Sequence, residues 1–272
     1  MNDKLILSIS PLGGLCNRMR VIDSALTLAD QIDAEIHLYW RLDKDFGCFF
    51  DSLWERPERI KKIVLLDLRR VGGRLKRLIV ENIIKRRSAY FLPAVEVDRL
   101  LAQNESDLFI NLCRKGHVFL QSCHRFFPSE QPFEKLIPIR TIREIINVET
   151  ADFDNVVGVH IRRTDNEKAI DASPTKLFVE KMHEVLKHNP RTTFFLATDS
   201  YEEQEFLIGK FPGRIRFYCK SSLNRGQEKV IQDALVDLCC LSRCRKLIGS
   251  YWSSFTDTAW QMNGIEHTII KV

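Results

Sequence analysis

The start of the chain switches twice between the hydrophobic spacing of a strand and that of a helix, and this alternation constrains the fold most strongly. A short apolar run at residues 5–9 leads into a turn that contains Gly13 and Gly14. Apolar residues then recur at helical spacing from Val21 to Ile32, and a second strand-like run spans residues 35–40. This order is that of a βαβ unit, so we expect parallel strands joined by a right-handed crossover.

The second half of the chain repeats this alternation. Strands are predicted at residues 156–161, 193–197, 215–218, 246–249 and 267–272, and helices at 175–188, 226–243 and 254–262. Alternating strands and helices indicate an α/β fold in which helices cover both faces of a parallel sheet. A chain of 272 residues is long enough for two such domains, which we place at residues 1–150 and 151–272.

The composition is that of a globular protein in a reducing compartment. The chain is 44% hydrophobic and 28% charged, and its net charge is +5. No apolar stretch is long enough to cross a bilayer, and the first residues do not resemble a secretory signal. The eight cysteines lack the density and pairing of a disulfide scaffold. We therefore expect a cytoplasmic protein with reduced thiols.

Residues 55–150 give a less clear pattern, but one segment within them is strongly basic. Residues 69–87 hold eight Lys or Arg and a single acidic residue, Glu81. Apolar residues interleave with the basic ones at helical spacing, which predicts an amphipathic helix. Its basic face is either solvated or a site for an anionic acceptor or a membrane surface. Nucleic acid is disfavoured, because the net charge is small and no aromatic residues interleave this run.

The first candidate ligand site is the loop between the first strand and the first helix. It reads Gly13-Gly14-Leu15-Cys16-Asn17-Arg18. Glycines let a ligand approach the backbone closely, and the start of a helix offers N–H groups to an anion. The spacing matches neither the dinucleotide-binding nor the P-loop fingerprint. The loop is therefore an anion site of another kind or simply a tight turn.

The second candidate site lies at the end of the strand predicted at residues 156–161. His160, Arg162, Arg163 and Asp165 follow one another there. Ligands of open α/β sheets bind at the carboxyl ends of strands. Because side chains alternate along a strand, His160 and Arg162 share one face and Arg163 takes the other. A diphosphate would match a guanidinium group in such a place, whereas Arg163 with Asp165 is alternatively a structural ion pair.

Polar residues also follow the later strands. Asp199 comes after the strand at 193–197, and Ser253, Ser254 and Phe255 come after the strand at 246–249. Asp237 lies in the helix predicted between them. A carboxylate can accept from the N–H groups of guanine, and hydroxyls at a helix start can hold phosphate. For each residue alone, a structural role explains the pattern as well as ligand binding does: Asp237 would face solvent, and Ser253 would cap the helix.

Together and in this order, the segments resemble the motifs of the α-1,6-fucosyltransferases. They are the run from His160 to Asp165, the triplet Ala197-Thr198-Asp199, Asp237 with Ser242, and the pair Ser253-Ser254. The resemblance covers residues 156–256 and extends to the glycine loop. That family is related to nodulation and protein O-fucosyltransferases, which are inverting enzymes with a GT-B-like fold and GDP-fucose as donor. The resemblance thus implies two Rossmann-like domains facing a cleft, with the donor on the C-terminal domain and the acceptor on the N-terminal side.

The resemblance also implies roles for individual residues. Arg162 would hold the β-phosphate and neutralise the departing GDP, with Arg163 and Asp165 as further catalytic residues. His160 and Asp237 would contact the nucleoside, and Asn17 and Arg18 would close over the donor. The full set of implied donor-binding residues is Gly13, Gly14, Asn17, Arg18, His160, Asp199, Asp237, Ser253, Ser254 and Phe255.

Three positions depart from the family pattern. Asn166 stands in place of a Lys, Ser200 in place of a second Asp, and Ile170 in place of an acidic residue, with Asp171 beside it. The donor-binding residues are therefore retained, whereas the acceptor side differs. The base that deprotonates the acceptor is left open among Asp165, Glu167 and Asp171.

Arginines can stabilise a departing diphosphate without a metal ion. We therefore expect metal-independent, inverting transfer of fucose from GDP-fucose to a hydroxyl of a glycan acceptor. Asp43 and Asp45 have the D-x-D spacing of metal-dependent transferases, but Asp152 and Asp154 show that this spacing arises by chance. One further cluster contains possible zinc ligands: Cys113, His117, Cys123 and His124. Its spacing matches no common zinc site, so we predict none there.

Two other functions stay open at this point. One is transfer from a different nucleotide sugar. The other is a non-catalytic module that binds a nucleotide sugar, which the departures at Asn166 and Ser200 would allow.

Overall fold

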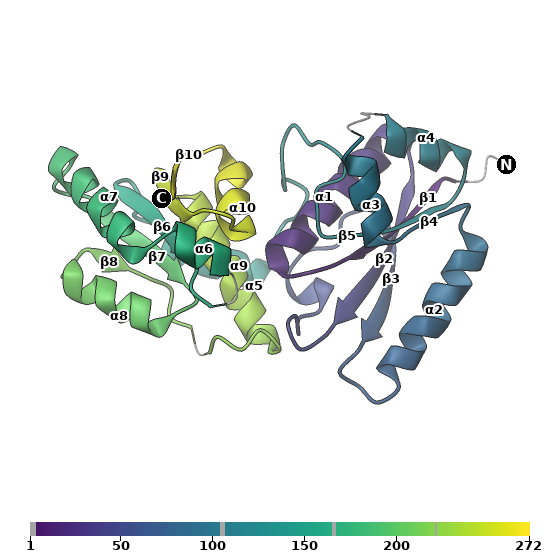
Figure 1. Ribbon diagram of the computed structural model, residues 1–272, viewed down its shortest axis with the longest axis horizontal. Coiled ribbons are helices and arrows are strands. Elements are labelled where there is room, and N and C mark those ends of the chain that lie inside the picture. The colour runs from purple at the N-terminus through teal and green to yellow at the C-terminus, as the bar shows by residue number, and fades with distance from the viewer. Residues whose placement is uncertain (1–3, 104–106, 165–166, 221) are drawn as a thin grey trace. The chain divides into compact units, whose positions relative to one another are not determined.

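The structure is a computed structural model that describes residues 4–103, 107–164, 167–220 and 222–272. It divides into two compact units. The first unit comprises Met1–Ile139 with Asn224–Ile231, and the second comprises Arg140–Leu223 with Gln232–Val272. The division falls before helix α5 (Arg140–Glu149), whereas the sequence analysis places it after that helix, at residue 150. Each unit contains one five-stranded parallel sheet (Figure 1).

The sheet of the first unit has the strand order β3-β2-β1-β5-β4. Its strands are β1 (Ile6–Pro11), β2 (Glu35–Leu42), β3 (Ile60–Asp67), β4 (Tyr90–Leu92) and β5 (Val118–Ser122). The helices are α1 (Leu15–Ile32), the short 3-10 helix η1 (Phe50–Ser52), α2 (Gly73–Arg87), α3 (Ala94–Leu101) and α4 (Leu108–Lys115). The predicted βαβ unit is confirmed, because β1 and β2 pair in parallel on either side of α1 in the sequence.

The region that was hard to interpret from the sequence contains β3, β4 and β5. β3 lies at the sheet edge, and its exposed Lys61 and Lys62 shorten its apolar run to residues 63–66. β4 has three residues, too few to show a period. The basic segment does form a helix, α2, as its spacing predicts.

The sheet of the second unit has the order β10-β9-β6-β7-β8. Its strands are β6 (Val156–Ile161), β7 (Thr193–Thr198), β8 (Ile215–Arg216), β9 (Lys246–Ser250) and β10 (Glu266–Ile270). Besides α5, its helices are α6 (Glu167–Ala172), α7 (Thr175–His188), α8 (Tyr201–Lys210), α9 (Glu228–Ser242) and α10 (Ser254–Asn263). The first residues of α9 belong to the first unit, which includes Asn224–Ile231. The predicted strands and helices of this half are all present with small differences at their ends. α8 was missed because its apolar residues form no single stripe: Leu207 is buried while Phe206 and Ile208 are exposed.

Both sheets reverse their strand order beside the first strand of the unit. In the second unit the chain runs from β6 outward to β7 and β8, and then returns to place β9 on the other side of β6. In the first unit β2 and β3 lie on one side of β1, and β5 lies on the other. Such a switch point opens a crevice at the carboxyl ends of the strands, where α/β proteins bind ligands. The glycine loop follows β1 and the arginine pair follows β6, so both sequence motifs lie at switch points.

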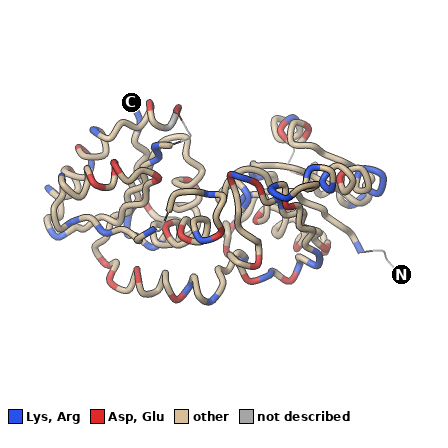
Figure 2. The backbone as a smooth tube through the Cα atoms, turned by 90° about the horizontal axis from the view of Figure 1, so that it is seen from below, with Lys and Arg blue, Asp and Glu red and all other residues tan. Residues whose placement is uncertain are grey.

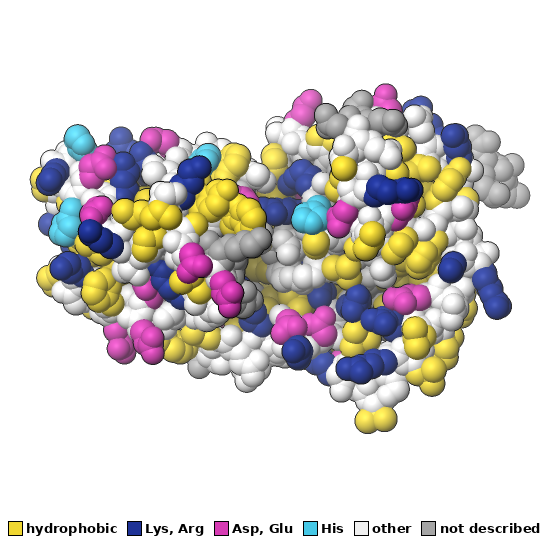
Figure 3. All heavy atoms as spheres, viewed as in Figure 1, with side chains coloured by type: hydrophobic (Ala, Val, Ile, Leu, Met, Phe, Trp, Pro, Cys, Tyr) yellow, Lys and Arg dark blue, Asp and Glu magenta, His cyan; other side chains and the backbone are white. Residues whose placement is uncertain are grey.

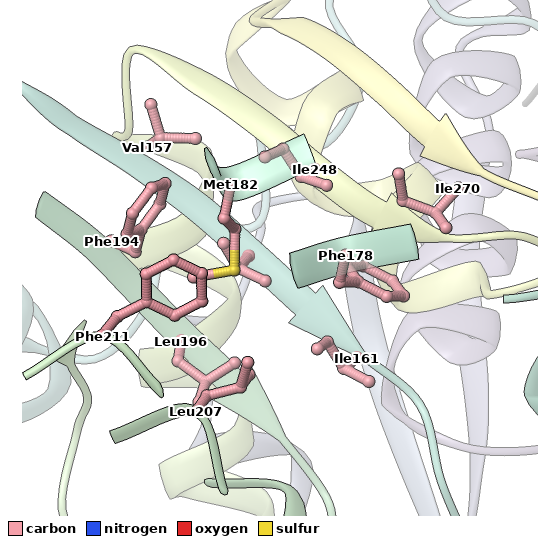
Figure 4. Packing of buried hydrophobic residues seen from close by; sticks show 11 residues of the cluster. Val157, Ile161, Phe178, Met182, Phe194, Leu196, Leu207, Phe211, Ile248 and Ile270 are labelled. Carbon is pink, nitrogen blue, oxygen red and sulfur yellow. The ribbon is translucent and has the colours of Figure 1, made fainter. Parts of the chain in front are cut away.

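The core of the second unit fills the space between its sheet and helices α7 and α8. Figure 4 shows Met182 and Phe178 of α7 lying against Phe194 and Ile161 of the sheet. All four side chains are fully buried. These contacts place the odd-numbered residues of β6 toward α7 and α8. The even-numbered residues face α9, where a Cβ on Gly158 would meet the side chain of Leu241 at 3.0 Å.

Among the described residues, no helix has both the length and the apolar character needed to cross a membrane.

We predict that Met182→Ala destabilises the second unit by about 2–5 kcal/mol, because it removes a buried side chain and leaves a cavity. Urea unfolding followed by circular dichroism measures this change. The matched control is Lys176→Ala on the same helix, whose side chain is 84% exposed and which should shift stability by about 0.5 kcal/mol or less. Equal effects of the two substitutions would contradict the placement of α7 against this core.

Candidate functional site

The candidate site of the second unit lies where β6 ends between β7 and β9. Three residues from these strand ends approach one another: Arg162 after β6, Asp199 after β7 and Ser250 at the end of β9. Arg162 Nη1 lies 2.9 Å from Asp199 Oδ2, and the Arg162 backbone N–H donates to Ser250 Oγ at 3.0 Å. The Arg162 side chain is 20% exposed, so the guanidinium group lies at the surface of the switch point and not inside the core.

The Asp199 carboxylate contacts three consecutive residues that follow β6. It accepts from the Arg163 backbone N–H at 2.7 Å and from Thr164 Oγ1 at 2.7 Å, in addition to the ion pair with Arg162. Burial alone would raise the pKa of Asp199, but Arg162 and these donors outweigh it and lower the pKa below the ordinary value. Asp199 therefore stays ionised and fixes the position of Arg162.

His160 lies two residues before Arg162, on β6, and is 4% exposed. Its Nδ1 lies 2.7 Å from Thr256 Oγ1, and its ring stacks on Phe255 with centroids 4.8 Å apart. Burial, together with the nearby arginines, lowers the pKa of His160 to about 3, although Asp199 opposes this shift. The ring is therefore neutral at neutral pH and can act as a hydrogen-bonding group rather than as a cation.

Gly249 in β9 leaves the room that this arrangement needs. A Cβ at this position would lie 2.2 Å from Thr256 Cγ2, well inside van der Waals contact. A larger residue would push Thr256 away from His160. The sequence analysis gave no role of their own to Gly249, Ser250 or Thr256, since a glycine or hydroxyl in a strand or helix carries no signal of its own.

Arg163 points to the opposite face of β6, as the alternation predicts. Its guanidinium group donates to Glu203 Oε2 at 3.0 Å, to Thr175 Oγ1 at 3.0 Å and to the Arg162 carbonyl at 2.8 Å. The side chain is 12% exposed. The guanidinium groups of the two arginines therefore contact different carboxylates. Arg162 pairs with Asp199, whereas Arg163 connects β6 to the starts of α7 and α8.

The carboxylate partner of Arg163 is Glu203, which the sequence analysis missed. Ser200 is the N-cap of α8, and its hydroxyl accepts from the Glu203 backbone N–H at 3.2 Å. Ser200-x-x-Glu203 is thus a capping-box sequence, a signal that was available. The serine that departs from the resemblance at position 200 therefore serves as a helix cap.

Asp237 of α9 is 3% exposed and bonds to Lys220, a second residue that was missed. Lys220 Nζ donates to Asp237 Oδ2 at 2.7 Å and to the Thr198 carbonyl at 2.8 Å, at the end of β7. Asp237 Oδ1 is buried and has no hydrogen-bond partner. Burial raises the pKa of Asp237 to about 6, although Lys220 lowers it in part. The expected contact of Asp237 with guanine stays a prediction.

Ser253 and Ser254 lie at the start of α10, beside the His160 contacts. Ser253 is the N-cap residue and is 5% exposed, and its side chain makes no capping hydrogen bond. Ser254 is the first residue of this ten-residue helix. The N–H groups of such a helix start, together with its partial positive charge, suit a phosphate group.

The glycine loop of the first unit has the backbone conformation that its sequence indicates. Gly13 has φ +78°, and a Cβ on it would lie 2.7 Å from Asn17 Nδ2, so both the turn and the packing of Asn17 require glycine. Gly14 is the N-cap residue of α1.

Arg18 of this loop is directed inward, and its side chain is 2% exposed. It donates to the carbonyls of Gly13 at 2.8 Å and Arg41 at 2.6 Å, and its guanidinium lies 3.9 Å from the ring centre of Phe46. Burial lowers the pKa of Arg18 to about 10, so it remains charged at neutral pH. In this arrangement Arg18 fixes the loop, and its expected contact with a donor stays a prediction.

Asp165, expected to be catalytic, and Asn166 lie outside the described residues. The other two candidate bases, Glu167 and Asp171, belong to α6.

Two of the groups considered as metal ligands, Asp43 and His117, make other contacts. Asp43 Oδ1 accepts from the Asp45 backbone N–H at 3.0 Å, and Asp43 Oδ2 lies 3.8 Å from Arg18 Nη2. His117 Nε2 lies 2.8 Å from Ser8 Oγ. Within the described ranges, no group of three or more His, Cys, Asp or Glu is arranged to hold a metal ion.

Comparison with solved structures finds the same fold in three fucosyltransferases. The first is the α-1,6-fucosyltransferase NodZ, which has been solved from Bradyrhizobium. Its structure soaked with GDP-fucose matches with a TM-score of 0.64 and 18% sequence identity, over 96% of this chain and 93% of the NodZ chain. POFUT1 in complex with GDP matches at 0.58 and 10% identity over 100% of both chains. A mutant of Arabidopsis thaliana FUT1 in complex with GDP matches at 0.60 and 12% identity over 98% of this chain and 70% of its own. No protein-family model and no curated protein matches the sequence. The chain therefore has a GT-B-like α/β fold.

The raised pKa of Asp237 predicts a specific pH dependence of stability. The folded protein binds a proton at this carboxyl more tightly than the unfolded chain does, so this group loses stabilising effect as pH rises from about 4 through about 6. Relative to Asp237→Asn, the wild type should lose roughly 3 kcal/mol of unfolding free energy over that range. Denaturant unfolding of both proteins at several pH values measures the difference.

The control is Asp152→Asn, because the exposed carboxyl of Asp152 has its pKa lowered by Arg216 and should give a difference of opposite sign. If the stability of the wild type relative to Asp237→Asn stays constant or rises with pH, the proposed burial of an ionisable Asp237 is wrong.

Proposed function

We propose that this protein is a fucosyltransferase that transfers fucose from GDP-fucose to a hydroxyl of a glycan, with inversion and without a metal ion. The observation that carries the proposal is the place of Arg162. It is a partly exposed guanidinium group that an ionised Asp199 holds at the switch point of a parallel sheet. The fold shared with fucosyltransferases that were solved with GDP or GDP-fucose supports the same reaction.

In the proposed mechanism Arg162 neutralises the charge that develops on the diphosphate as the bond to fucose breaks. A preorganised donor of this kind contributes about 3 kcal/mol to the stabilisation of a transition state. Ser253, Ser254 and the N–H groups at the start of α10 offer further donors to phosphate oxygens. A neutral His160 beside Phe255 suits a contact with the nucleoside.

The acceptor hydroxyl must lose a proton as it attacks the anomeric carbon from the side opposite the diphosphate. Asp165, Glu167 and Asp171 remain the candidate bases for this step. Attack from that side turns a β-linked donor into an α-linked product. Arg163 has no direct part in this proposal, since its contacts with Glu203 and Thr175 give it a positioning role.

The first test is Arg162→Ala, which should lower turnover of GDP-fucose about 100-fold or more and weaken GDP binding. Release of GDP with a panel of glycan acceptors measures turnover, and calorimetry measures GDP affinity. Arg191→Ala, which removes an exposed arginine of the same unit, is the control and should behave as the wild type. Unchanged turnover in Arg162→Ala would refute the role of Arg162.

The same assay separates the competing functions. GDP binding with no transfer to any acceptor would favour a non-catalytic module, and turnover of another nucleotide sugar in preference to GDP-fucose would favour a different transferase.

The second test is removal of divalent metal. We expect treatment with EDTA to leave the rate unchanged, since fixed guanidinium charge replaces the metal ion at the diphosphate. The assay is GDP release before and after chelation, with added Mn²⁺ or Mg²⁺ as the reference. A large loss of rate that either ion restores would revive a role for Asp43 and Asp45.

A further inference from the structure

Helix α2 carries apolar residues on two opposite sides. On one side Ile84 is 4% exposed and packs with Val80 on the sheet of the first unit. The other side faces solvent and carries four large apolar residues with exposed fractions of 62%, 50%, 52% and 46%: Leu75, Leu78, Ile79 and Ile83. Val71, just before the helix, is also fully exposed. A helix that only covers a sheet would have polar residues on its outer side.

The exposed apolar residues form a stripe bordered by positive charge. With about 3.6 residues per turn, Leu75, Leu78, Ile79 and Ile83 fall on neighbouring positions of the outer face, and the exposed Asn82 and Arg86 lie among them. Arg74 and Lys85 border this stripe on one side, and Lys76 and Arg87 border it on the other. Figure 3 shows hydrophobic and Lys or Arg side chains next to one another over the place that α2 has in Figure 1.

The charge of α2 is unusual for this chain. Figure 2 shows acidic and basic residues interspersed over most of the backbone. α2 instead has six Lys or Arg and a single acidic residue, Glu81, which lies 3.6 Å from Arg77. Helix stability accounts for only part of this pattern. Lys85, Arg86 and Arg87 lie in the last turn, where positive charge is favourable, but the basic residues near the start of the helix are not explained in this way, and the first turn contains no acidic residue.

We propose that the outer face of α2 docks on an anionic membrane surface. The four apolar side chains of the stripe enter the boundary between headgroups and acyl chains, and the flanking Arg74, Lys76, Lys85 and Arg87 contact anionic headgroups. This inference does not depend on the proposed function.

Two other occupants fit the surface less well. A nucleic acid would use the charges but would leave the apolar stripe in water, and the stripe offers no aromatic residue for bases to stack on. A second copy of α2 would bring two positively charged borders together, which opposes a symmetric dimer.

The test is flotation of the full chain with phosphatidylcholine vesicles that contain or lack phosphatidylglycerol. We expect about tenfold or greater preference for the anionic vesicles, and a loss of binding as salt is raised. The double variant Leu78→Ser with Ile79→Ser should lose at least about tenfold in vesicle binding, and so should Lys76→Gln with Arg87→Gln.

Matched control variants change residues of the same kind outside α2. Val95→Ser removes a side chain of α3 that is 81% exposed, and Arg114→Gln with Lys115→Gln removes two exposed charges from α4. Both controls should bind vesicles as the wild type does. Far-UV circular dichroism and urea unfolding confirm that every variant is folded.

Absence of binding to anionic vesicles, or equal binding by the wild type and the stripe variant, would overturn the proposal. So would a dimer in sedimentation analysis that the stripe variant abolishes without any vesicle binding, since a second copy would then occupy the surface. Tight binding of a DNA or RNA oligonucleotide that is insensitive to Leu78→Ser with Ile79→Ser, without vesicle binding, would assign the surface to nucleic acid.

Discussion

The ion pair between Arg162 and Asp199 is the interaction on which the candidate site depends. It joins the ends of two neighbouring strands, β6 and β7, and the same carboxylate also accepts from the Arg163 backbone N–H and the Thr164 hydroxyl. Because these contacts hold Asp199 in its ionised form, Arg162 has a compensating charge before any ligand binds. An arginine fixed in this way needs little reorganisation when charge develops next to it, which is the physical basis of electrostatic catalysis.

The alternation of side chains along β6 gives neighbouring residues separate tasks. His160 and Arg162 face the side of α10, where Thr256 and Phe255 hold the histidine ring. Arg163 faces α7 and α8, where Glu203 neutralises it. One strand end therefore presents a neutral hydrogen-bonding ring and a cation on one face, while its other face anchors the strand to the helices.

The parts of the site that the sequence predicts are those set by local periodicity. The strand at 156–161, the opposite faces of Arg162 and Arg163, and the glycine turn at Gly13 all follow from period and residue type. Lys220 as the partner of Asp237 does not, because it comes from a segment without regular structure that is distant in the sequence. The inward direction of Arg18 depends on the aromatic residues Trp40 and Phe46, whose packing no local pattern reveals.

The two units use the same topology with arginines that serve different purposes. In each, the first strand is central, and the loop after it lies where the strand order reverses. Arg18 in the first unit is enclosed by carbonyl oxygens and rings, so its charge stabilises the loop itself. Arg162 in the second unit is partly exposed, so its charge is available at the surface. The loop of the second unit therefore presents an accessible guanidinium group, whereas the loop of the first unit presents a glycine turn and the backbone N–H groups at the start of α1.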